Sequence, residues 1–129
     1  MSTNAENAAI AVAKAFNDAF NAQDHAAQAA TMNYPHLRLA GGAFATIRSA
    51  AHFLELAKEI KGRLDKENSH HTNNPSIEVL QSGDDKVHLV LHQERCHENG
   101  EVYNRFDTLW IVTLQDGYWG VQFRSSNLR

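Results

Sequence analysis

The chain has 129 residues, 43% of them hydrophobic, which suits one globular domain with a single core. Its formal net charge is -3 and its basic residues are scattered, which argues against the concentrated positive surface of a nucleic-acid-binding protein. There is neither a signal-like start nor an apolar run long enough to span a membrane, and the lone Cys96 has no disulfide partner within the chain. We therefore expect one cytoplasmic domain over residues 1–129, without nucleic-acid or membrane partners.

The first expected element is an amphipathic helix over residues 5–22. This segment is rich in alanine, a strong helix former, and Phe16 and Phe20 lie four residues apart on one helical face. Thr3 or Asn4 is the expected N-cap, because both side chains can accept a hydrogen bond from the first turn. The aromatic face should therefore pack against the core.

Two further helices and a hairpin follow in chain order. A short helix is expected over residues 24–32, with Asp24 as its N-cap and Pro35 ending helical structure just downstream. Residues 36–47 alternate about a Gly41-Gly42 pair, which predicts a β-hairpin. Ser49 should cap a third helix over residues 50–64.

The remainder of the chain has the pattern of an antiparallel sheet. Residues 65–75 are polar and rich in turn formers, so a loop is expected there. Beyond the loop, alternating segments are separated by Asn99-Gly100 and Asp116-Gly117, residue pairs that favour two-residue hairpin turns. The sequence therefore predicts an α+β fold in which three N-terminal helices cover one face of a curved antiparallel sheet.

The two hairpin turns also predict which residues face each other. A two-residue turn at Asn99-Gly100 sets His92 opposite Asp107 and Glu94 opposite Arg105. The corresponding turn at Asp116-Gly117 pairs Trp110 with Phe123 and Thr108 with Ser125. With this register, the face expected against the helices carries Leu89, Leu91, Thr108, Trp110, Val112, Trp119, Val121, Phe123 and Ser125.

The charged pairs His92–Asp107 and Glu94–Arg105 fall on the other face of the sheet. Opposite charges across an antiparallel pair are ordinary on an outer face, so we interpret them as structural. The alternative is that a β-bulge turns them into a pocket, where they would form an active site. The same outer face carries an apolar band, which predicts a homodimer formed through it: His88, Val90, Leu109, Ile111 and Tyr118.

The order of three segments, "FNDAFNAQD", "YPHLRLAGG" and "DGYWGVQFRSS", resembles the NTF2-like superfamily, in particular its SnoaL-like and ketosteroid-isomerase-like branch. The resemblance covers nearly the whole chain. It implies a cone-shaped α+β barrel with a small-molecule pocket between the helices and the concave sheet face, and dimers formed through the convex face. Ketosteroid isomerases use a tyrosine and an aspartate, and the matching positions here hold Phe16 and Ala40. Neither can move a proton, so whether the protein is an enzyme stays open.

The same resemblance places His36 and Arg38 toward the pocket, whereas simple alternation places the intervening leucines there, and both alternatives stay open. If they point inward, Arg38 suits a carboxylate or enolate, His36 suits proton transfer near neutral pH, and Tyr34 adds a phenolic donor. Expected pocket walls are aromatic, aliphatic and a few polar side chains: Phe16, Phe20, Phe53, Leu91, Gln93, Phe106, Thr108, Trp110, Phe123 and Ser125.

Two kinds of function fit these residues. One is a lyase, isomerase or cyclase-type enzyme acting on a small carbonyl or carboxylate compound through His36, Arg38 and Tyr34. The other is a non-catalytic ligand-binding or interaction dimer, whose ligand is small and apolar or weakly acidic. No metal or other cofactor is expected, because His88 and His92 lie about 13 Å apart along a strand and no glycine-rich phosphate loop is present.

Overall fold

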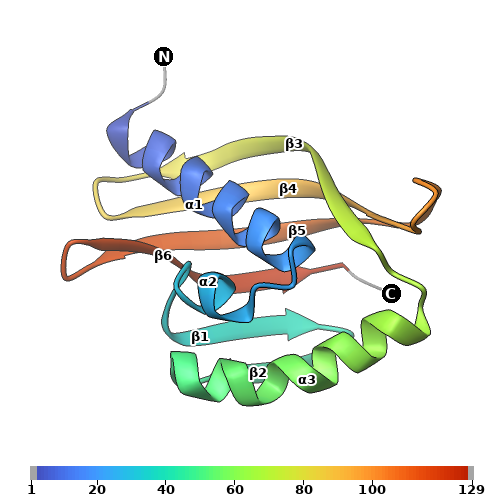
Figure 1. Cartoon of the computed structure of the whole chain (residues 1–129). Coiled ribbons are helices and arrows are strands. Elements are labelled where there is room, and N and C mark those ends of the chain that lie inside the picture. The colour runs from blue at the N-terminus through green and yellow to red at the C-terminus, as the bar shows by residue number, and fades with distance from the viewer. Residues whose placement is uncertain (1–2, 128–129) are drawn as a thin grey trace.

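The computed structural model describes residues 3–127, in which three helices lie against one six-stranded sheet (Figure 1). The helices are α1 (Asn4–Asn21), α2 (His25–Ala29) and α3 (Ala50–Lys66). The strands are β1 (Met32–Ala40), β2 (Ala43–Ile47), β3 (His71–Ser82), β4 (Lys86–Cys96), β5 (Val102–Gln115) and β6 (Tyr118–Ser126). The sheet order is β2-β1-β6-β5-β4-β3, and its pairs are antiparallel except for the parallel pair of β1 and β6.

The helices begin where the sequence predicts. The side chains of Thr3, Asp24 and Ser49 each accept a hydrogen bond from a backbone N–H in the first turn that follows. The second helix is shorter than expected, because the chain enters β1 at Met32. Pro35, expected to stop helical structure, lies instead inside β1, where the pairing of β1 with β6 is interrupted and a missing N–H is tolerated.

The loop expected over residues 65–75 is partly wrong, because β3 begins at His71. The backbone at the start of β3 is bound by side chains from α1: Asn17 and Asn21 both donate to the carbonyl of Thr72, at 2.9 and 2.8 Å. Pro75 falls where the register between β3 and β4 shifts, on the edge strand of the sheet. An edge strand tolerates proline and polar residues, which explains why composition alone indicated a loop.

The predicted register of β4 and β5 is confirmed from Lys86–Thr113 to Arg95–Asn104. Next to the turn it shifts by one residue, so that Cys96 pairs with Val102, and the predicted two-residue turn at Asn99-Gly100 is wrong because the His97 N–H donates to the Glu101 carbonyl. The predicted register of β5 and β6 is correct only near its turn. Val112 pairs with Val121 as predicted, but Ile111 then pairs with Phe123. Gln122 is therefore an extra residue, a β-bulge, beyond which the side chains of β6 change faces. The predicted pairs Trp110–Phe123 and Thr108–Ser125 are wrong, and Trp110 pairs with Arg124 instead.

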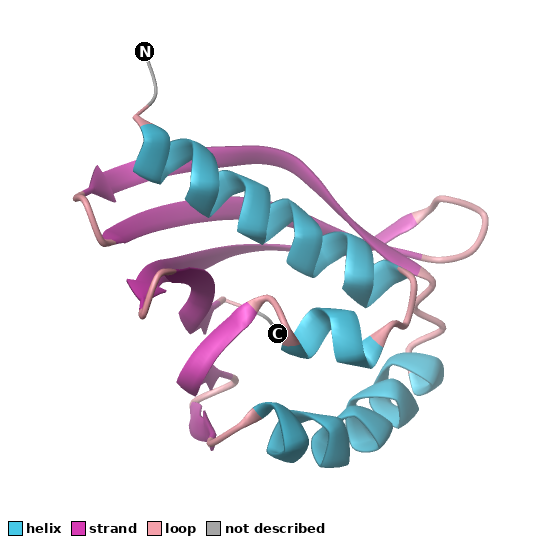
Figure 2. Cartoon of the chain, turned by 60° about the vertical axis from the view of Figure 1, so that its left-hand side comes forward, coloured by secondary structure: helices cyan, strands magenta, loops and turns pink. Residues whose placement is uncertain are grey.

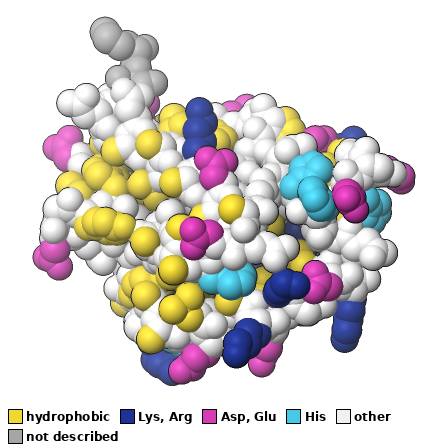
Figure 3. Space-filling view, in the orientation of Figure 1, with side chains coloured by type: hydrophobic (Ala, Val, Ile, Leu, Met, Phe, Trp, Pro, Cys, Tyr) yellow, Lys and Arg dark blue, Asp and Glu magenta, His cyan; other side chains and the backbone are white. Residues whose placement is uncertain are grey.

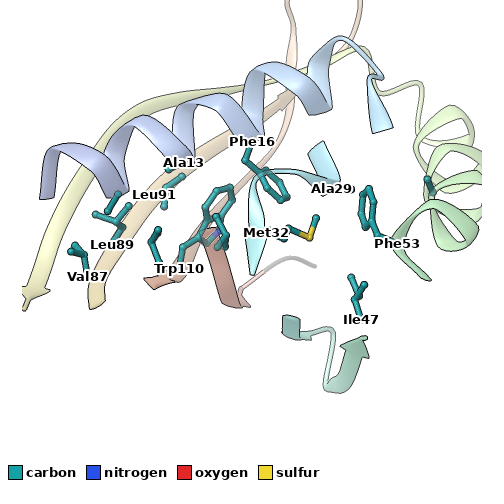
Figure 4. Close-up of a cluster of buried hydrophobic side chains, with 14 residues drawn as sticks. Ala13, Phe16, Ala29, Met32, Ile47, Phe53, Val87, Leu89, Leu91 and Trp110 are labelled. Atoms are coloured by element: carbon teal, nitrogen blue, oxygen red, sulfur yellow. The ribbon is translucent and has the colours of Figure 1, made fainter. Parts of the chain in front are cut away.

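The three helices lie on the same, concave side of the sheet (Figure 2). α1 packs across β3 to β6, and α3 lies beside β2. In the core, the ring of Phe16 meets Trp110 edge to face with centroids 4.8 Å apart, and Phe53 enters from α3 (Figure 4). Truncating such a buried aromatic side chain typically costs about 3–5 kcal/mol, so these rings fix α1 and α3 against the sheet.

Candidate anion-binding pocket

A cavity of about 370 Å3 lies between α3 and the strands β1, β2 and β6. Its apolar wall comes mainly from α3 and β2, with Phe53, Leu56 and Ile60 facing Ala45 and Ile47. A neighbouring hollow of about 30 Å3 shares Phe20 and Phe53 with it and has room for little more than a water molecule. The larger cavity is therefore the one that suits a small organic ligand.

The polar lining of this cavity is dominated by four arginines from four different elements. Arg38 comes from β1, Arg124 from β6, Arg95 from β4 and Arg63 from α3. Two carboxylates, Glu59 and Glu67, also line it. We call Arg38, Arg95 and Arg124 the arginine cluster, because these three project from the sheet toward one space.

Arg124 is held from two sides. Its Nε lies 3.0 Å from Nε2 of His36, and its guanidinium lies over the ring of Phe16, 4.9 Å from the centroid. Nδ1 of His36 lies 2.8 Å from the carbonyl oxygen of Val121. A carbonyl only accepts, so Nδ1 carries the hydrogen and Nε2 accepts from Arg124. The fully buried His36 ring thus fixes the direction of the Arg124 side chain.

The same surroundings keep His36 neutral. Burial, together with the neighbouring Arg124, lowers the pKa of His36 to about 3. Both ring nitrogens are occupied and the ring takes up no proton near neutral pH. The geometry therefore favours a positioning role for His36 over the proton-transfer role considered from sequence.

The arginine cluster carries mutually repelling charges. Burial lowers the pKa of Arg124 to about 9, with Arg38 and Arg95 contributing to the same shift. Burial likewise lowers the pKa of Arg38, with Arg95 and Arg63 adding to the effect. Among the described residues, the buried Nε atoms of Arg38 and Arg95 have no hydrogen-bond partner. The cavity thus presents cationic donors that lack acceptors.

On β1, the side chains of His36 and Arg38 both lie on the concave side of the sheet, and of the two only Arg38 lines the cavity. His36 is fully buried and Arg38 lines the cavity, whereas Leu39 is 37% exposed on the opposite face. The alternative that placed the leucines of β1 in the pocket is wrong, because Leu37 and Leu39 lie on the convex face. Tyr34 does not line this cavity: its hydroxyl donates to the carbonyl of Ala29 at 2.7 Å, and burial raises its pKa to about 12.

The expected wall residues fall into three groups. Phe20 and Phe53 line the cavity, while Phe16 and Phe106 lie beneath the guanidinium groups of Arg124 and Arg95. Four others lie on the concave face as expected but outside the cavity lining: Leu91, Gln93, Thr108 and Trp110. Phe123 and Ser125 are misplaced by the prediction, since the bulge at Gln122 turns both to the convex face.

Three lining arginines were missed from sequence, and two of them had a signal. Arg95 continues the inward alternation of Leu91 and Gln93, and Arg63 extends the helical face that carries Phe53, Leu56 and Ile60. Arg124 had none, because its inward direction depends on the bulge in β6.

The charged pairs lie across the sheet from this cavity, at the register predicted. Nδ1 of His92 lies 2.6 Å from Oδ1 of Asp107, and Nε of Arg105 donates to Oε2 of Glu94 at 3.0 Å. Glu78 adds a second carboxylate 3.5 Å from Nε2 of His92. The hydrogen bond that His92 donates to Asp107, with a smaller contribution from its interaction with Glu78, raises the pKa of His92. No bulge brings these pairs into the pocket.

Comparison with known proteins identifies the family. The sequence model of the family described as NTF2-like protein (DUF6841) matches residues 7–123, so the chain belongs to this NTF2-like family. A search of curated proteins returned no match in sequence. Within residues 3–127, no helix is long and apolar enough to cross a membrane, and no group of three or more side chains is placed to hold a metal ion.

Solved structures share the fold at low sequence identity. A ketosteroid isomerase-like protein from Erwinia carotovora atroseptica superposes with a TM-score of 0.73 at 18% identity, covering 98% of each chain. An NTF-2 like protein of unknown function from Shewanella oneidensis gives 0.70 at 15% identity, covering 92% of this chain and 94% of its own. Aln2 from a Streptomyces species gives 0.73 at 13% identity, covering 99% and 93%. These likenesses establish the NTF2-like, cystatin-like fold.

Proposed function

We propose that the protein binds a small organic acid in the cavity between α3 and the sheet. The acidic group contacts Arg38 and Arg124, and the apolar body of the ligand packs against Phe53, Leu56 and Ile60. The observation that carries the proposal is the arginine cluster itself, in which the buried Nε atoms of Arg38 and Arg95 lack acceptors among the described residues, beside an apolar wall. A guanidinium pairs a carboxylate through two parallel hydrogen bonds, which satisfies donors that water-poor surroundings leave unpaired.

Binding without catalysis is the function we favour. His36 is neutral with both nitrogens occupied, and the Tyr34 hydroxyl donates to a backbone carbonyl. Phe16 and Ala40 stand where ketosteroid isomerases have their proton-moving groups. The enzyme alternative then rests on Glu59 as a base acting on a carbonyl compound whose enolate the arginines stabilise, since Glu59 also lines the cavity. Loss of turnover in Glu59→Gln with unchanged binding would establish that alternative.

Calorimetric titration tests the proposed function with two ligands of one shape, phenylacetate and its neutral amide, phenylacetamide. Phenylacetate should bind saturably, and Arg38→Leu should weaken it by about tenfold or more, since a charge-assisted pair is lost. The matched control is Arg48→Leu, because Arg48 is exposed and outside the cavity lining. Equal affinity for acid and amide, or an equal loss in both variants, would contradict the proposal.

We also propose that two copies associate through the convex face of the sheet. The bulge in β6 enlarges the apolar band expected there, because it adds Phe123, whose ring lies 6.4 Å from that of the exposed Phe44. Leu39 on β1 lies between them and opposite Phe44 in the ladder. A monomer rarely leaves so continuous an apolar sheet face in water, and a second copy offers an equally apolar surface.

A reducing compartment such as the cytoplasm suits the free thiol of Cys96.

A further inference from the structure

The cavity holds more positive charge than one carboxylate group neutralises. Four arginines face two glutamates in its lining, which leaves two positive charges in excess. Of the two glutamates, Glu67 pairs with Arg95 at 3.6 Å and also accepts from the Tyr103 hydroxyl. Glu59 is exposed on α3. Among the described residues, neither carboxylate forms an ion pair with Arg38, Arg124 or Arg63. Arg63 is exposed to solvent, so the part of the excess charge that is shielded from water belongs to Arg38 and Arg124.

Arg38 and Arg124 are direct neighbours in the sheet. They are register partners in the parallel pairing of β1 with β6 and point to the same face. Adjacent strands lie about 4.8 Å apart, so two guanidinium groups start from neighbouring backbone positions, an arrangement that destabilises the sheet unless an anion lies between them. The hydrogen bond of Arg124 to His36 and its contact with Phe16 prevent it from swinging away from its neighbour.

Arg95 completes the cluster from β4. Its guanidinium lies over the ring of Phe106, 5.4 Å from the centroid, and its Nε is buried without a partner among the described residues. We infer that the ligand carries two negative charges at one end, as a phosphate monoester or a dicarboxylate does, and that Arg38, Arg95 and Arg124 bind this end together. The inference rests on the function proposed above and makes it more specific.

A dianion fits this cluster better than a single carboxylate for a geometric reason. One carboxylate has two oxygens and is fully occupied by one guanidinium in the bidentate arrangement. A phosphate has three terminal oxygens, and a dicarboxylate has four, so either can accept from two or three guanidinium groups at once. Two negative charges also match the excess of two positive charges in the lining.

The test compares ligands that share a phenyl group and differ in charge. Phenylacetate has one negative charge, whereas phenyl phosphate and phenylsuccinate each have two above pH 7. Affinities are measured by calorimetry at pH 7.5 and constant ionic strength, with inorganic phosphate as a further probe. We expect at least one dianion to bind about tenfold more tightly than phenylacetate. The gain in affinity comes from a second guanidinium, which forms charge-assisted hydrogen bonds with the additional negative group.

Two variants test whether the tighter binding of the dianion depends on the arginine cluster. Arg38→Leu should reduce the affinity for the dianion to the level that the wild type shows for phenylacetate. Arg48→Leu should leave the affinity for the dianion unchanged. Tight binding of phenyl phosphate and inorganic phosphate, with weak binding of phenylsuccinate, would assign a phosphate ligand, and the reverse pattern would assign a dicarboxylate. Either pattern supports the inference.

Two other results would count against it in different ways. Equal affinity for phenylacetate and both dianions would overturn the dianion inference and leave the proposed binding of an organic acid intact. If none of the anions binds, or if phenylacetamide binds as tightly as phenylacetate, the proposed function itself fails and the inference fails with it.

Discussion

The buried ring of His36 fixes the direction of the Arg124 guanidinium in the pocket. His36 accepts from Arg124 and donates to the Val121 carbonyl, so one neutral side chain connects the β1 and β6 backbones to a guanidinium in the lining. The sequence indicated that His36 was a candidate site residue with a role in proton transfer, whereas the geometry favours a positioning role. Burial explains the difference, since an imidazole removed from water beside a cation stays uncharged.

Replacing His36 with phenylalanine should therefore damage both stability and binding. The His36→Phe variant keeps a ring of similar shape but leaves the Val121 carbonyl and the Nε of Arg124 without partners, which should cost about 1–3 kcal/mol in the free energy of unfolding. Urea unfolding measures that loss, and titration with phenylacetate should show weaker binding because Arg124 is no longer oriented. Unchanged stability together with unchanged affinity would show that His36 has no positioning role.

The depressed pKa of His36 also predicts a pH dependence of stability. The folded-state pKa is about 3 and the ordinary value is 6.5, so between these values the unfolded chain binds the proton more readily. This contribution to stability is complete above pH 6.5 and is lost as the pH falls toward 3. Denaturant unfolding at several pH values should show a steeper acid loss in the wild type than in His36→Phe. Parallel curves would contradict the assignment.

Arg38 should behave as a residue kept for binding at the expense of stability. Its Nε has no partner among the described residues and its charge is repelled by Arg95 and Arg63. Arg38→Leu should leave the unliganded protein as stable as the wild type or more stable by about 1 kcal/mol, while affinity for phenylacetate falls. A large loss of stability in thermal unfolding would mean that Arg38 is a structural residue.

At the scale of elements, the strand registers decide which side chains reach the pocket. The turn pair Asp116-Gly117 predicts the start of the β5–β6 register correctly. The turn at Asn99-Gly100 is longer than predicted, and the β4–β5 register still comes out right from Lys86 to Arg95, because a one-residue shift between Arg95 and Cys96 compensates for the longer turn. The bulge at Gln122 was beyond prediction, because the surrounding residues alternate as in a regular strand. It exchanges Phe123 for Arg124 on the concave face, so the main cationic group of the site was hidden from pattern analysis.

The charged pairs on the convex face give a prediction for β4 and β5. In the monomer, Asp107→Asn should lower stability by at most about 1 kcal/mol, because exposed ion pairs contribute little, whereas a dimer interface that buries the pair raises the loss to about 3–5 kcal/mol. Ligand binding should be unchanged in both cases, because the cavity lies on the other face. The raised pKa of His92 should move back toward 6.5 in the variant, as followed by NMR titration of the ring. In the wild type this pairing stabilises the fold below pH 6.5 and is lost as the pH rises through the raised pKa. Loss of ligand binding in Asp107→Asn would overturn the face assignment.

For the whole molecule, the helices cover one face of the sheet and leave the convex face uncovered. Figure 3 shows basic and acidic side chains interspersed on the helix-bearing side, whereas the convex face combines charged pairs with the apolar band. The sequence predicted this division correctly, because the fold class follows from periodicity and turn residues over long segments. The pocket is harder to predict, since it depends on four arginines from separate elements.

Association through the convex face is tested by a charge placed in the apolar band. Ile111→Glu should shift a dimer toward monomer in light scattering at micromolar concentration, because a carboxylate would be buried in an apolar contact. Leu54→Glu is the matched control, since Leu54 is an exposed leucine on α3 and not on the sheet. A wild-type monomer at this concentration, or equal dissociation of both variants, would contradict the proposed dimer.

The most direct test of the binding site is NMR observation of the arginine side-chain Nε–H signals during titration with phenyl phosphate. A bound dianion should shift the signals of Arg38, Arg95 and Arg124 together along one saturable curve, because all three guanidinium groups contact the same anion. The Nε–H of Arg124 keeps its bond to His36, and its signal shifts because the terminal nitrogens of the same guanidinium bind the anion. The exposed Arg48 and the convex-face Arg105 should not move. Saturable shifts confined to the arginine cluster are the predicted result. Shifts confined to the exposed arginines, or no saturable shift at all, would contradict an anion site in this cavity.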